Sequence, residues 1–267
     1  MYLYNTWMKW RDWQAMTKYE AIFRRKSVRK YKKMEVEEPI LKKIREYGRE
    51  AVGYRPDVRV KWKIYKACDR KVKGLFQVKA PYYAALYSET CEDCQIYAGC
   101  LMEQLVLYMH TVGIGSCYQG SARLQEDEEE DLKLMMILAF GYPEESLERA
   151  RTDFKRAEFQ KLVKTGGSMD KNLKRLLDCA RLAPSALNQQ PWRFVVTENR
   201  IHLFVKRPGR VGYQKQLEKN LFHAGIVLSH MLLAAEEHWL DLEYQKLNSI
   251  MEKAIQNYLY TGSLILS

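Results

Sequence analysis

A dense run of basic side chains with one hydroxyl lies early in the sequence, at Arg24-Arg25-Lys26-Ser27-Val28-Arg29-Lys30. Guanidinium groups two to four residues apart, together with a serine hydroxyl, can direct several charge-assisted hydrogen bonds to one point. A phosphate group, with about two negative charges at neutral pH, is a ligand that suits such a run. Basic runs are also common on solvated surfaces, so this motif alone leaves both interpretations open.

A second unusual run is Ala183-Pro184-Ser185-Ala186-Leu187-Asn188-Gln189-Gln190-Pro191-Trp192. It follows a predicted helix and precedes a predicted strand, so its amide side chains fall in a loop. Amide groups present donors and acceptors together, as the pyrimidine edge of a heterocyclic ligand requires. The simpler alternative is a proline-bounded turn with a capping serine.

The six cysteines show no disulfide-framework spacing in a chain of 267 residues, and we expect them to be reduced. Cys91-Glu-Asp-Cys94 with Cys100 nearby suggests part of a metal site. A second Cys-x-x-Cys pair and a His-x-x-x-His partner are missing, whereas a structural zinc site needs four ligands. We therefore predict no metal.

The composition indicates a globular protein, with 47% hydrophobic and 12% aromatic residues. No apolar run approaches the roughly 20 residues that span a bilayer, and the first residues lack the apolar core of a secretion signal. We expect a cytoplasmic protein without a membrane partner.

The net charge of +11 is concentrated at one end, because residues 1–80 hold 23 Lys and Arg against 9 Asp and Glu. Such a region could attract nucleic acid, a membrane surface or a phosphorylated small molecule. A solvated surface with interspersed Lys and Arg is the plainest interpretation.

Hydrophobic periodicity predicts the elements that must position these motifs. Helices are expected over 17–31, where the helix leads into a basic turn, and over 39–51, 93–112, 173–182, 221–239 and about 242–257. Strands are expected over 58–65, 82–87, 134–140, 192–197 and 201–205. Residues 144–170 are expected to connect two parts of the chain, and an apolar tail follows residue 257.

The predicted elements repeat in order, and the residues echo the repetition. LKKIREYGREA matches LKRLLDCARLA, and VKWKIY falls on WRFVVT at the same offset; YAGCLMEQLVLYMHTVGI matches HAGIVLSHMLLAAEEHWL and shares its Ala-Gly pair. The matched segments begin at Leu41 and Leu173, at Val60 and Trp192, and at Tyr97 and His223. We predict a duplicated helix–strand–strand–helix unit, against the alternative that amphipathic helices always look somewhat alike.

Four segments together closely resemble the FMN-dependent nitroreductases: RRKSVRKY, APSALNQQPWRF, GIGSCYQG at 113–120 and LAFGYPEE at 138–145. The resemblance covers most of residues 17–205, and its Pro-Ser-x-x-Asn-x-Gln-Pro-Trp run is quite specific. It implies an α+β fold with antiparallel or mixed sheets flanked by helices, in which FMN lies at a dimer interface.

The resemblance also implies which residues bind FMN. Arg25, Lys26, Ser27 and Arg29 would hold the phosphate and ribityl chain, with Arg156 and Lys155 as further candidates for the phosphate. Backbone around Tyr118, Gln119 and Gly120 would face the isoalloxazine ring. From the other half of the chain, the ring would be approached by Pro184, Ser185, Ala186, Asn188 and Gln190.

The chain departs from the family in how these motifs are distributed. The first half carries the basic run but has AVGYRPDVRVKW after its helix, where only the second half has APSALNQQPW. This resembles a subgroup with fused, diverged repeats, in which one chain folds as an intramolecular pseudo-dimer with one FMN site. We expect an extension at 1–15, repeats at 16–165 and 166–267, and a monomer, with further dimerisation left open. Lys26, where the family usually has arginine, and Gln119, where many members have an acidic or apolar residue, also depart from the pattern.

The resemblance implies an oxidoreductase that passes electrons from NAD(P)H to nitroaromatic, quinone or flavin acceptors. The cofactor carries the difficult chemistry, so no catalytic side chain is assigned. The five histidines lie mainly on or beside apolar elements and are expected to be core or surface residues. Two alternatives remain: an FMN-binding sensor or store with little turnover, and a nucleic-acid binder that uses aromatic residues such as Trp7 and Tyr31.

Overall fold

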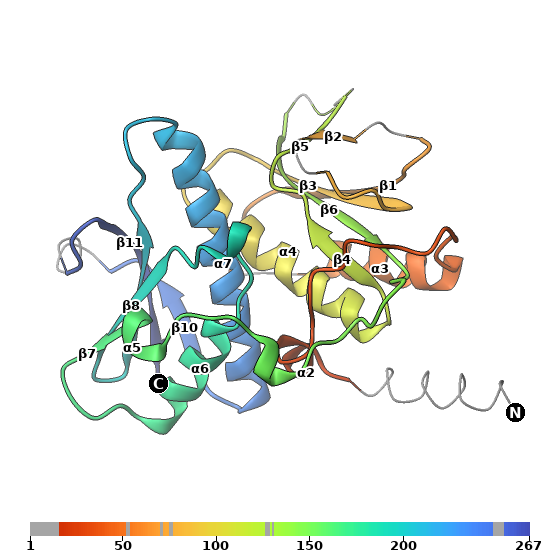
Figure 1. Ribbon diagram of the computed structural model, residues 1–267. Helices are drawn as coiled ribbons and strands as arrows, with labels where there is room; N and C mark the ends of the chain where they lie inside the picture. The colour runs from red at the N-terminus through yellow and green to blue at the C-terminus, as the bar shows by residue number, and fades with distance from the viewer. Residues whose placement is uncertain are drawn as a thin grey trace, which may run out of the picture. The chain divides into compact units, whose positions relative to one another are not determined.

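The computed structural model describes residues 16–51, 54–69, 72–74, 77–125, 129, 131–247 and 254–267 (Figure 1). The predicted extension at 1–15 lies outside these residues, as does most of the acidic run at 126–131. The described residues form two compact units. Unit 1 contains those up to Cys94 together with Met102–Asp153, and unit 2 contains Gln95–Leu101 with Phe154–Ser267. The predicted repeat boundary after residue 165 stays a prediction.

Unit 1 is built on a four-stranded antiparallel sheet with the order β1-β3-β6-β4, beside a two-stranded sheet of β2 and β5. Its elements are α2 (Lys18–Ile22), α3 (Glu38–Glu50), β1 (Val60–Lys66), β2 (Val72–Gly74), β3 (Tyr82–Ser88), most of α4 (Cys94–Thr111), β4 (Gly115–Tyr118), β5 (Ala122–Leu124), β6 (Lys133–Gly141) and the short η1 (Arg151–Asp153).

Local sequence accounts for the main elements of unit 1. Helix α3 has proline in its first turn, where the missing N–H costs nothing, and it buries an apolar stripe that includes Leu41 and Ile44. All seven residues of β3 are buried, as expected for an apolar run in the middle of a sheet. The ring of Tyr47 on α3 stacks on Tyr108 of α4, with centroids 4.1 Å apart.

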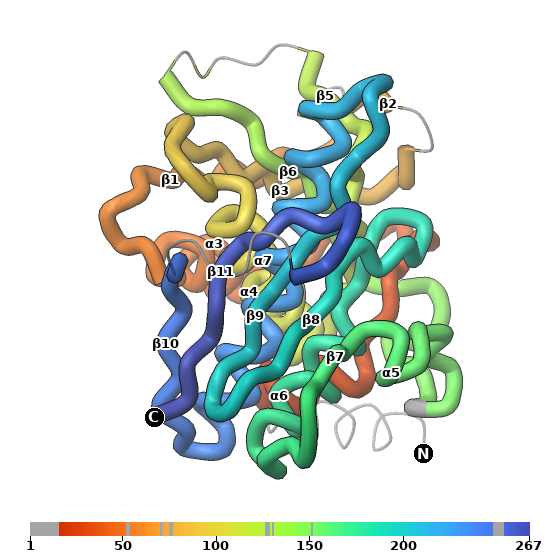
Figure 2. Tube along the Cα trace, turned by 90° about the vertical axis from the view of Figure 1, so that its left-hand side faces the viewer, coloured from red at the N-terminus to blue at the C-terminus, as the bar shows by residue number. Residues whose placement is uncertain are grey.

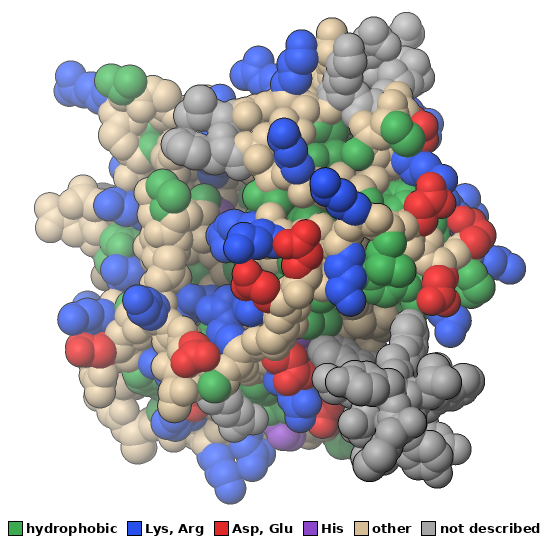
Figure 3. All heavy atoms as spheres, turned by 45° about the vertical axis from the view of Figure 1, so that its right-hand side comes forward, with side chains coloured by type: hydrophobic (Ala, Val, Ile, Leu, Met, Phe, Trp, Pro, Cys, Tyr) green, Lys and Arg blue, Asp and Glu red, His purple; other side chains and the backbone are tan. Residues whose placement is uncertain are grey.

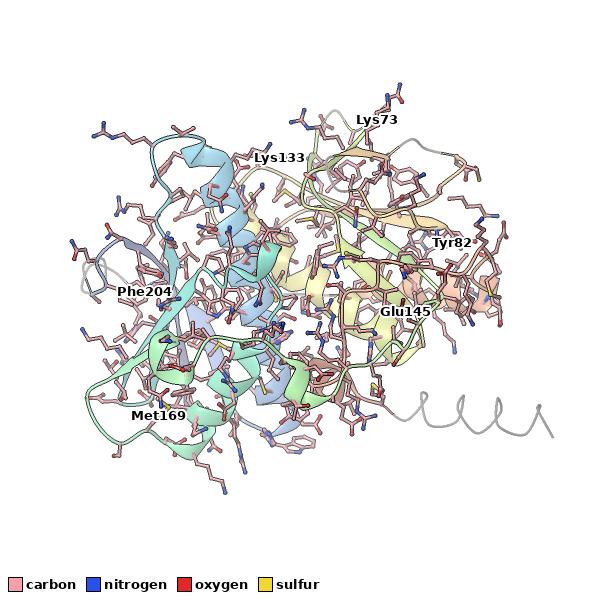
Figure 4. All side chains as sticks on the ribbon, viewed as in Figure 1. Lys73, Tyr82, Lys133, Glu145, Met169 and Phe204 are labelled. Carbon is pink, nitrogen blue, oxygen red and sulfur yellow. The ribbon has the colours of Figure 1, made fainter. Side chains whose placement is uncertain are left out.

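Unit 2 has a five-stranded mixed sheet with the order β10-β11-β9-β8-β7, in which β7 pairs with β8 in parallel and the other pairs are antiparallel (Figure 2). Its elements are α5 (Phe159–Leu162), β7 (Val163–Thr165), α6 (Lys171–Arg181), η2 (Ala186–Asn188), β8 (Trp192–Thr197), β9 (Arg200–Lys206), α7 (Tyr213–Glu237), β10 (Leu242–Gln245) and β11 (Tyr258–Leu266). Figure 4 labels Phe204 on β9 and Tyr82 at the start of β3, two large side chains buried in the respective units.

The two units share one connectivity. In each, a helix precedes a strand that pairs antiparallel with the next long strand, and a long helix follows. The order β1-β3-β6-β4 corresponds to β8-β9-β11-β10, and unit 2 adds β7 beside β8. The predicted helix–strand–strand–helix succession is therefore present twice.

A close helix crossing inside unit 2 gives the repeated Ala-Gly pair a structural reason. A Cβ atom on Gly99 would lie 2.0 Å from the carbonyl oxygen of Phe222, and one on Gly225 would lie 1.9 Å from that of Ile96. Residues 95–101 of α4 thus meet α7 backbone to backbone. Only glycine permits this approach, because any side chain would overlap a main-chain oxygen.

Most predicted elements are confirmed, among them the strand at 192–197 with its bounds. The helix predicted over about 242–257 is wrong: Leu242–Gln245 is an edge strand paired with β11, and residues 248–253 lie outside the described part. Residues 17–31, predicted as a helix that leads into a basic turn, are helical at Lys18–Ile22. Beyond the helix the chain forms bridges to Ser116 of β4 and to Pro143, which follows β6. The connection predicted at 144–170 contains β7, and the segment Gly115–Tyr118, for which no strand was predicted, is strand β4.

Candidate functional site

The basic segment of unit 1 is held by pairing with distant backbone. Helix α2 begins with a capping box at Thr17, and after it the chain forms isolated bridges from Arg25 to Glu148, from Ser27 to Ser116 and from Tyr31 to Pro143. Two features hold the segment against the sheet. The Tyr31 hydroxyl is 3.1 Å from the carbonyl oxygen of Ala139 on β6, and the side chain of Val28 packs against Gly115 of β4, where a Cβ would lie 2.6 Å from it.

Arg25 is buried, with 5% of its surface exposed, and it is only partly neutralised. Its Nη1 lies 3.8 Å from Oε1 of Glu103, a fully buried carboxylate on α4. The other carboxylate oxygen accepts a hydrogen bond from the Tyr118 hydroxyl at 2.5 Å. The Nη2 atom of Arg25 is buried and meets no acceptor among the described residues. A buried guanidinium donor without an acceptor is costly, and an anionic ligand would satisfy it.

Two further arginines stand near Arg25. Burial lowers the pKa of Arg149, and the positive charges of Arg25 and Arg29 lower it further while Asp153 opposes them. We call Arg25, Arg29 and Arg149 the arginine cluster. The charge of Arg25 also acts on His110. The pKa of His110 is lowered to about 3, first by burial and then by the charges of Arg25 and of Arg24, which lies next to the cluster in sequence. Three arginines that influence one another, with a buried carboxylate beside Arg25, favour an anion here.

The outer edge of the basic segment is neutralised. Arg24 pairs with Glu148 at 3.4 Å, and Lys30 pairs with Glu145, which Figure 4 labels, at 3.2 Å. On the face shown in Figure 3, Lys and Arg side chains are interspersed with Asp and Glu. Within this segment, the buried Nη2 of Arg25 is the donor that meets no acceptor among the described residues.

The remaining sequence-predicted residues of unit 1 take different positions. Lys26 and Ser27 are half-buried beside the cluster, and Gly120 is exposed with open space where a Cβ would be. Gln119 is buried and its amide is engaged by main chain: Oε1 accepts from Val78 N at 2.9 Å, and Nε2 donates to the Cys117 carbonyl at 3.1 Å. Gln119 therefore positions the end of β4.

In unit 2 the segment between α6 and β8, residues 183–191, folds as a tight loop; we call it the 183–191 loop. Three of its non-glycine residues have left-handed backbone: Leu187, Asn188 and Gln190, with φ of 51°, 55° and 47°. Leu187 is 91% exposed. Such backbone costs free energy and persists where surrounding contacts impose it, often at functional sites.

The loop's amide side chains impose this backbone. Asn188 Nδ2 donates to the Lys155 carbonyl at 2.7 Å, and its Oδ1 accepts from Arg156 Nη1 at 3.0 Å. Gln190 Oε1 accepts from Ala157 N at 2.9 Å, while its backbone N–H donates to the Ser185 hydroxyl oxygen at 2.9 Å. These amides, predicted to face a ligand, thus form hydrogen bonds inside unit 2, and Arg156 binds the loop. Pro184 is half-buried and Ala186 exposed at the loop's outer part.

His223 on α7 holds the 183–191 loop through a hydrogen bond to its backbone. Its Nε2 accepts the backbone N–H of Ala186 at 3.1 Å. Burial, followed by the charge of Lys219, lowers its pKa to about 4, so the ring is neutral and can accept this bond. The Nδ1 atom is buried and has no partner among the described residues.

Sequence reasoning did not name three residues that the structure places at these segments: Glu103, Arg149 and His223. A carboxylate inside the apolar run of α4 was one available signal, because such a group needs a partner. For His223 the signal was its place directly before the Ala-Gly pair that both long helices share.

The donors present fit an FMN phosphate, whose charge the arginine cluster could neutralise through charge-assisted hydrogen bonds. In the part of the chain that the structure describes, no group of His, Cys, Asp and Glu could hold a metal ion. Nor does any helix there combine the length and apolar character needed to cross a membrane.

A solved structure shares this fold, and others match part of the chain. The chain matches the crystal structure of a "putative nitroreductase" from Thermotoga maritima MSB8 with a TM-score of 0.64 and 22% identity, over 94% of this chain and 93% of the other. A nitroreductase family protein from Clostridium difficile 630 matches with a TM-score of 0.44 and 18% identity, over 55% and 96%. An FMN-dependent nitroreductase from Clostridium difficile R20291 matches with a TM-score of 0.40 and 19% identity, over 51% and 93%.

A comparison with curated protein sequences gives no match. The sequence model of the family described as "Putative TM nitroreductase" matches residues 17–235, which include every element from α2 to most of α7. The α+β architecture, the basic segment and the 183–191 loop all lie within this match, and the chain therefore belongs to this nitroreductase family.

Proposed function

We propose that this protein is an FMN-dependent oxidoreductase that passes electrons from NAD(P)H to a small acceptor such as a nitroaromatic, a quinone or a free flavin. Membership of the nitroreductase family supports this proposal. The observation that carries it is the buried Nη2 donor of Arg25 inside the arginine cluster. This donor has no acceptor in the part of the chain that the structure describes, and it suits the phosphate that distinguishes FMN from riboflavin.

The chain's own residues would do the binding. Arg25, Arg29 and Arg149 would donate to the phosphate, and Lys26 and Ser27 would add a charge and a hydroxyl beside it. Glu103 keeps the Arg25 side chain in place through its 3.8 Å contact. When bound, FMN supplies the hydride and electron transfer, so the protein needs to supply position and electrostatics rather than a catalytic acid or base.

The 183–191 loop would contribute backbone and small side chains to the flavin ring. Its shape is set by the amides of Asn188 and Gln190 and by His223, all hydrogen-bonded inside unit 2. The backbone at Tyr118 to Gly120 would also face the flavin ring. The side chain of Gln119 holds this backbone in place by accepting a hydrogen bond from Val78 N.

We also infer that the two units descend from a duplication, as in the fused-repeat subgroup. The common strand order and the shared Ala-Gly pair of α4 and α7 support this. Only unit 1 carries the arginine cluster, and only unit 2 carries the Pro-Ser-x-x-Asn-x-Gln-Pro-Trp run. We therefore expect one FMN per chain.

The first test is the visible spectrum of the purified protein, followed by identification of the released cofactor and addition of NADH or NADPH. About one FMN per chain that is bleached and reoxidised by an acceptor is the expected result. Two FMN per chain would contradict the one-site inference. A flavin that is bound but not reduced at a catalytic rate would indicate the sensor or store.

A sharper test separates phosphate recognition from ring binding. Arg29→Gln removes an exposed guanidinium of the cluster, and Lys32→Gln makes the same charge change on a neighbouring exposed side chain. A charge-assisted hydrogen bond contributes about 1.5–3 kcal/mol, so R29Q should weaken FMN binding about 10- to 100-fold. The affinity for riboflavin should be unchanged in both variants, and K32Q should bind FMN normally. Equal losses for FMN and riboflavin would refute the phosphate role.

A further inference from the structure

Cys91 and Cys94 lie at the start of α4, in a Cys-Glu-Asp-Cys sequence that the proposed flavin chemistry does not use. Cys94 is the first helical residue and is 1% exposed, whereas Cys91 is half-buried. Between them the chain makes a turn in which Cys94 N donates to the Cys91 carbonyl at 3.4 Å and Asp93 has φ of 59°. The Cys91 side chain is therefore partly accessible to solvent, whereas that of Cys94 is enclosed.

The two cysteines are neighbours across the turn, and the Cys94 thiol is close enough to Cys91 to raise the pKa of its thiol. A turn of this kind brings the Cα atoms of its first and fourth residues within about 7 Å, and a disulfide requires about 4.4–6.8 Å. The pair can therefore close with little backbone movement. Neither cysteine belongs to a metal-ligand cluster in the described residues.

We propose that Cys91 and Cys94 form a reversible dithiol–disulfide site that exchanges with low-molecular-weight disulfides. The Cys91 thiolate attacks one sulfur of the small disulfide, which breaks its S–S bond and releases the first thiol. Cys94 then loses its proton and attacks the Cys91 sulfur, which forms the protein disulfide and releases the second thiol. The protein loses two electrons and two protons, and the small disulfide gains them.

The groups around Cys91 affect the rate of this exchange through the pKa of its thiol. Burial and the neighbouring Cys94 thiol raise the pKa of the Cys91 thiol, while the guanidinium of Arg55 lowers it and Glu89 raises it. Since the thiolate is the attacking species, exchange should be slow at neutral pH and faster in mildly alkaline solution.

The test uses the full chain incubated with oxidised glutathione, quenched with acid, alkylated at free thiols and mapped by mass spectrometry. The expected product is an internal Cys91–Cys94 disulfide: both alkylated thiols are lost, the mass falls by two hydrogens, and dithiothreitol reverses both changes. Among the six cysteines, all within the described residues, Cys68 alone is exposed. Cys68→Ser therefore removes the background reaction without touching the pair.

Cys94→Ser removes the second thiol and should trap glutathione on Cys91, where the parent protein accumulates little adduct. If Cys94→Ser fails to fold, Cys94→Ala makes the same test, and circular dichroism confirms the fold in each case. The proposal is overturned if Cys91 and Cys94 both stay alkylated while Cys68 reacts. It is equally overturned if the Cys94 variant traps no more glutathione on Cys91 than the parent does.

Discussion

Because His223 hydrogen-bonds the 183–191 loop, we predict that acid lowers the free energy of unfolding by a definite amount. His223 is 7% exposed, and its Nε2 accepts the Ala186 N–H at 3.1 Å. A protonated ring cannot accept that bond, and burial lowers the pKa of His223 from 6.5 to about 4. The perturbation is His223→Gln, which removes the titrating ring but keeps an oxygen that can accept the Ala186 N–H.

The magnitude follows from proton linkage. Between pH 6.5 and about 4 the unfolded chain binds a proton at this histidine and the folded chain does not, so acid favours unfolding. The stabilisation is present above pH 6.5 and is lost as the pH falls towards 4. The whole lowering corresponds to about 3 kcal/mol, and about 2 kcal/mol of it falls between pH 7 and pH 5.

The assay is urea unfolding of the parent protein and H223Q at pH 7 and pH 5. The parent should lose about 2 kcal/mol more stability than the variant over this interval. His110, whose pKa is lowered to about 3, titrates in both proteins and cancels in the difference. His238→Gln, at the C-cap of α7, is the control for replacing a histidine by glutamine as such. Equal losses in the parent and H223Q would refute the reasoning, whatever the stability of the variant at pH 7.

Two further predictions concern backbone constraints in unit 2. Gly225→Ala would place a Cβ 1.9 Å from the Ile96 carbonyl oxygen, so it should destabilise the protein by about 1–3 kcal/mol and lower its melting temperature by several degrees. Gly209→Ala, where a Cβ meets open space, is the control and should leave the melting temperature unchanged. Equal melting temperatures for the two variants would contradict the close helix crossing. Leu187→Asn should stabilise the folded protein by up to about 1 kcal/mol, because asparagine tolerates the left-handed backbone at φ of 51° better than leucine. Little hydrophobic burial is lost, because the Leu187 side chain is exposed. Val211→Asn, at an equally exposed position, should leave the free energy of unfolding unchanged in the same urea titration, and a loss of stability in L187N would show that the leucine side chain has a contact of its own.

Local patterning was sufficient for the elements whose burial repeats at a fixed period. The stripe of Ile40, Leu41 and Ile44 predicted α3, and the apolar run of Trp192–Thr197 predicted β8, because side-chain spacing alone determines which face is buried. Residue types also singled out the basic segment and the 183–191 loop as candidates for phosphate and heterocycle recognition, and that role stays a prediction.

What the sequence could not supply is the set of contacts between distant segments. Leu242–Gln245 is a strand because it pairs with β11, and Gly115–Tyr118 because it pairs with β6; neither pairing has a local signature. The same holds for Glu103 beside Arg25 and for His223 beneath Ala186, which the chain brings together over long separations. Sequence alone thus determined which residue types could bind, whereas tertiary structure decided which groups are satisfied within the fold and which buried donor is left for a ligand.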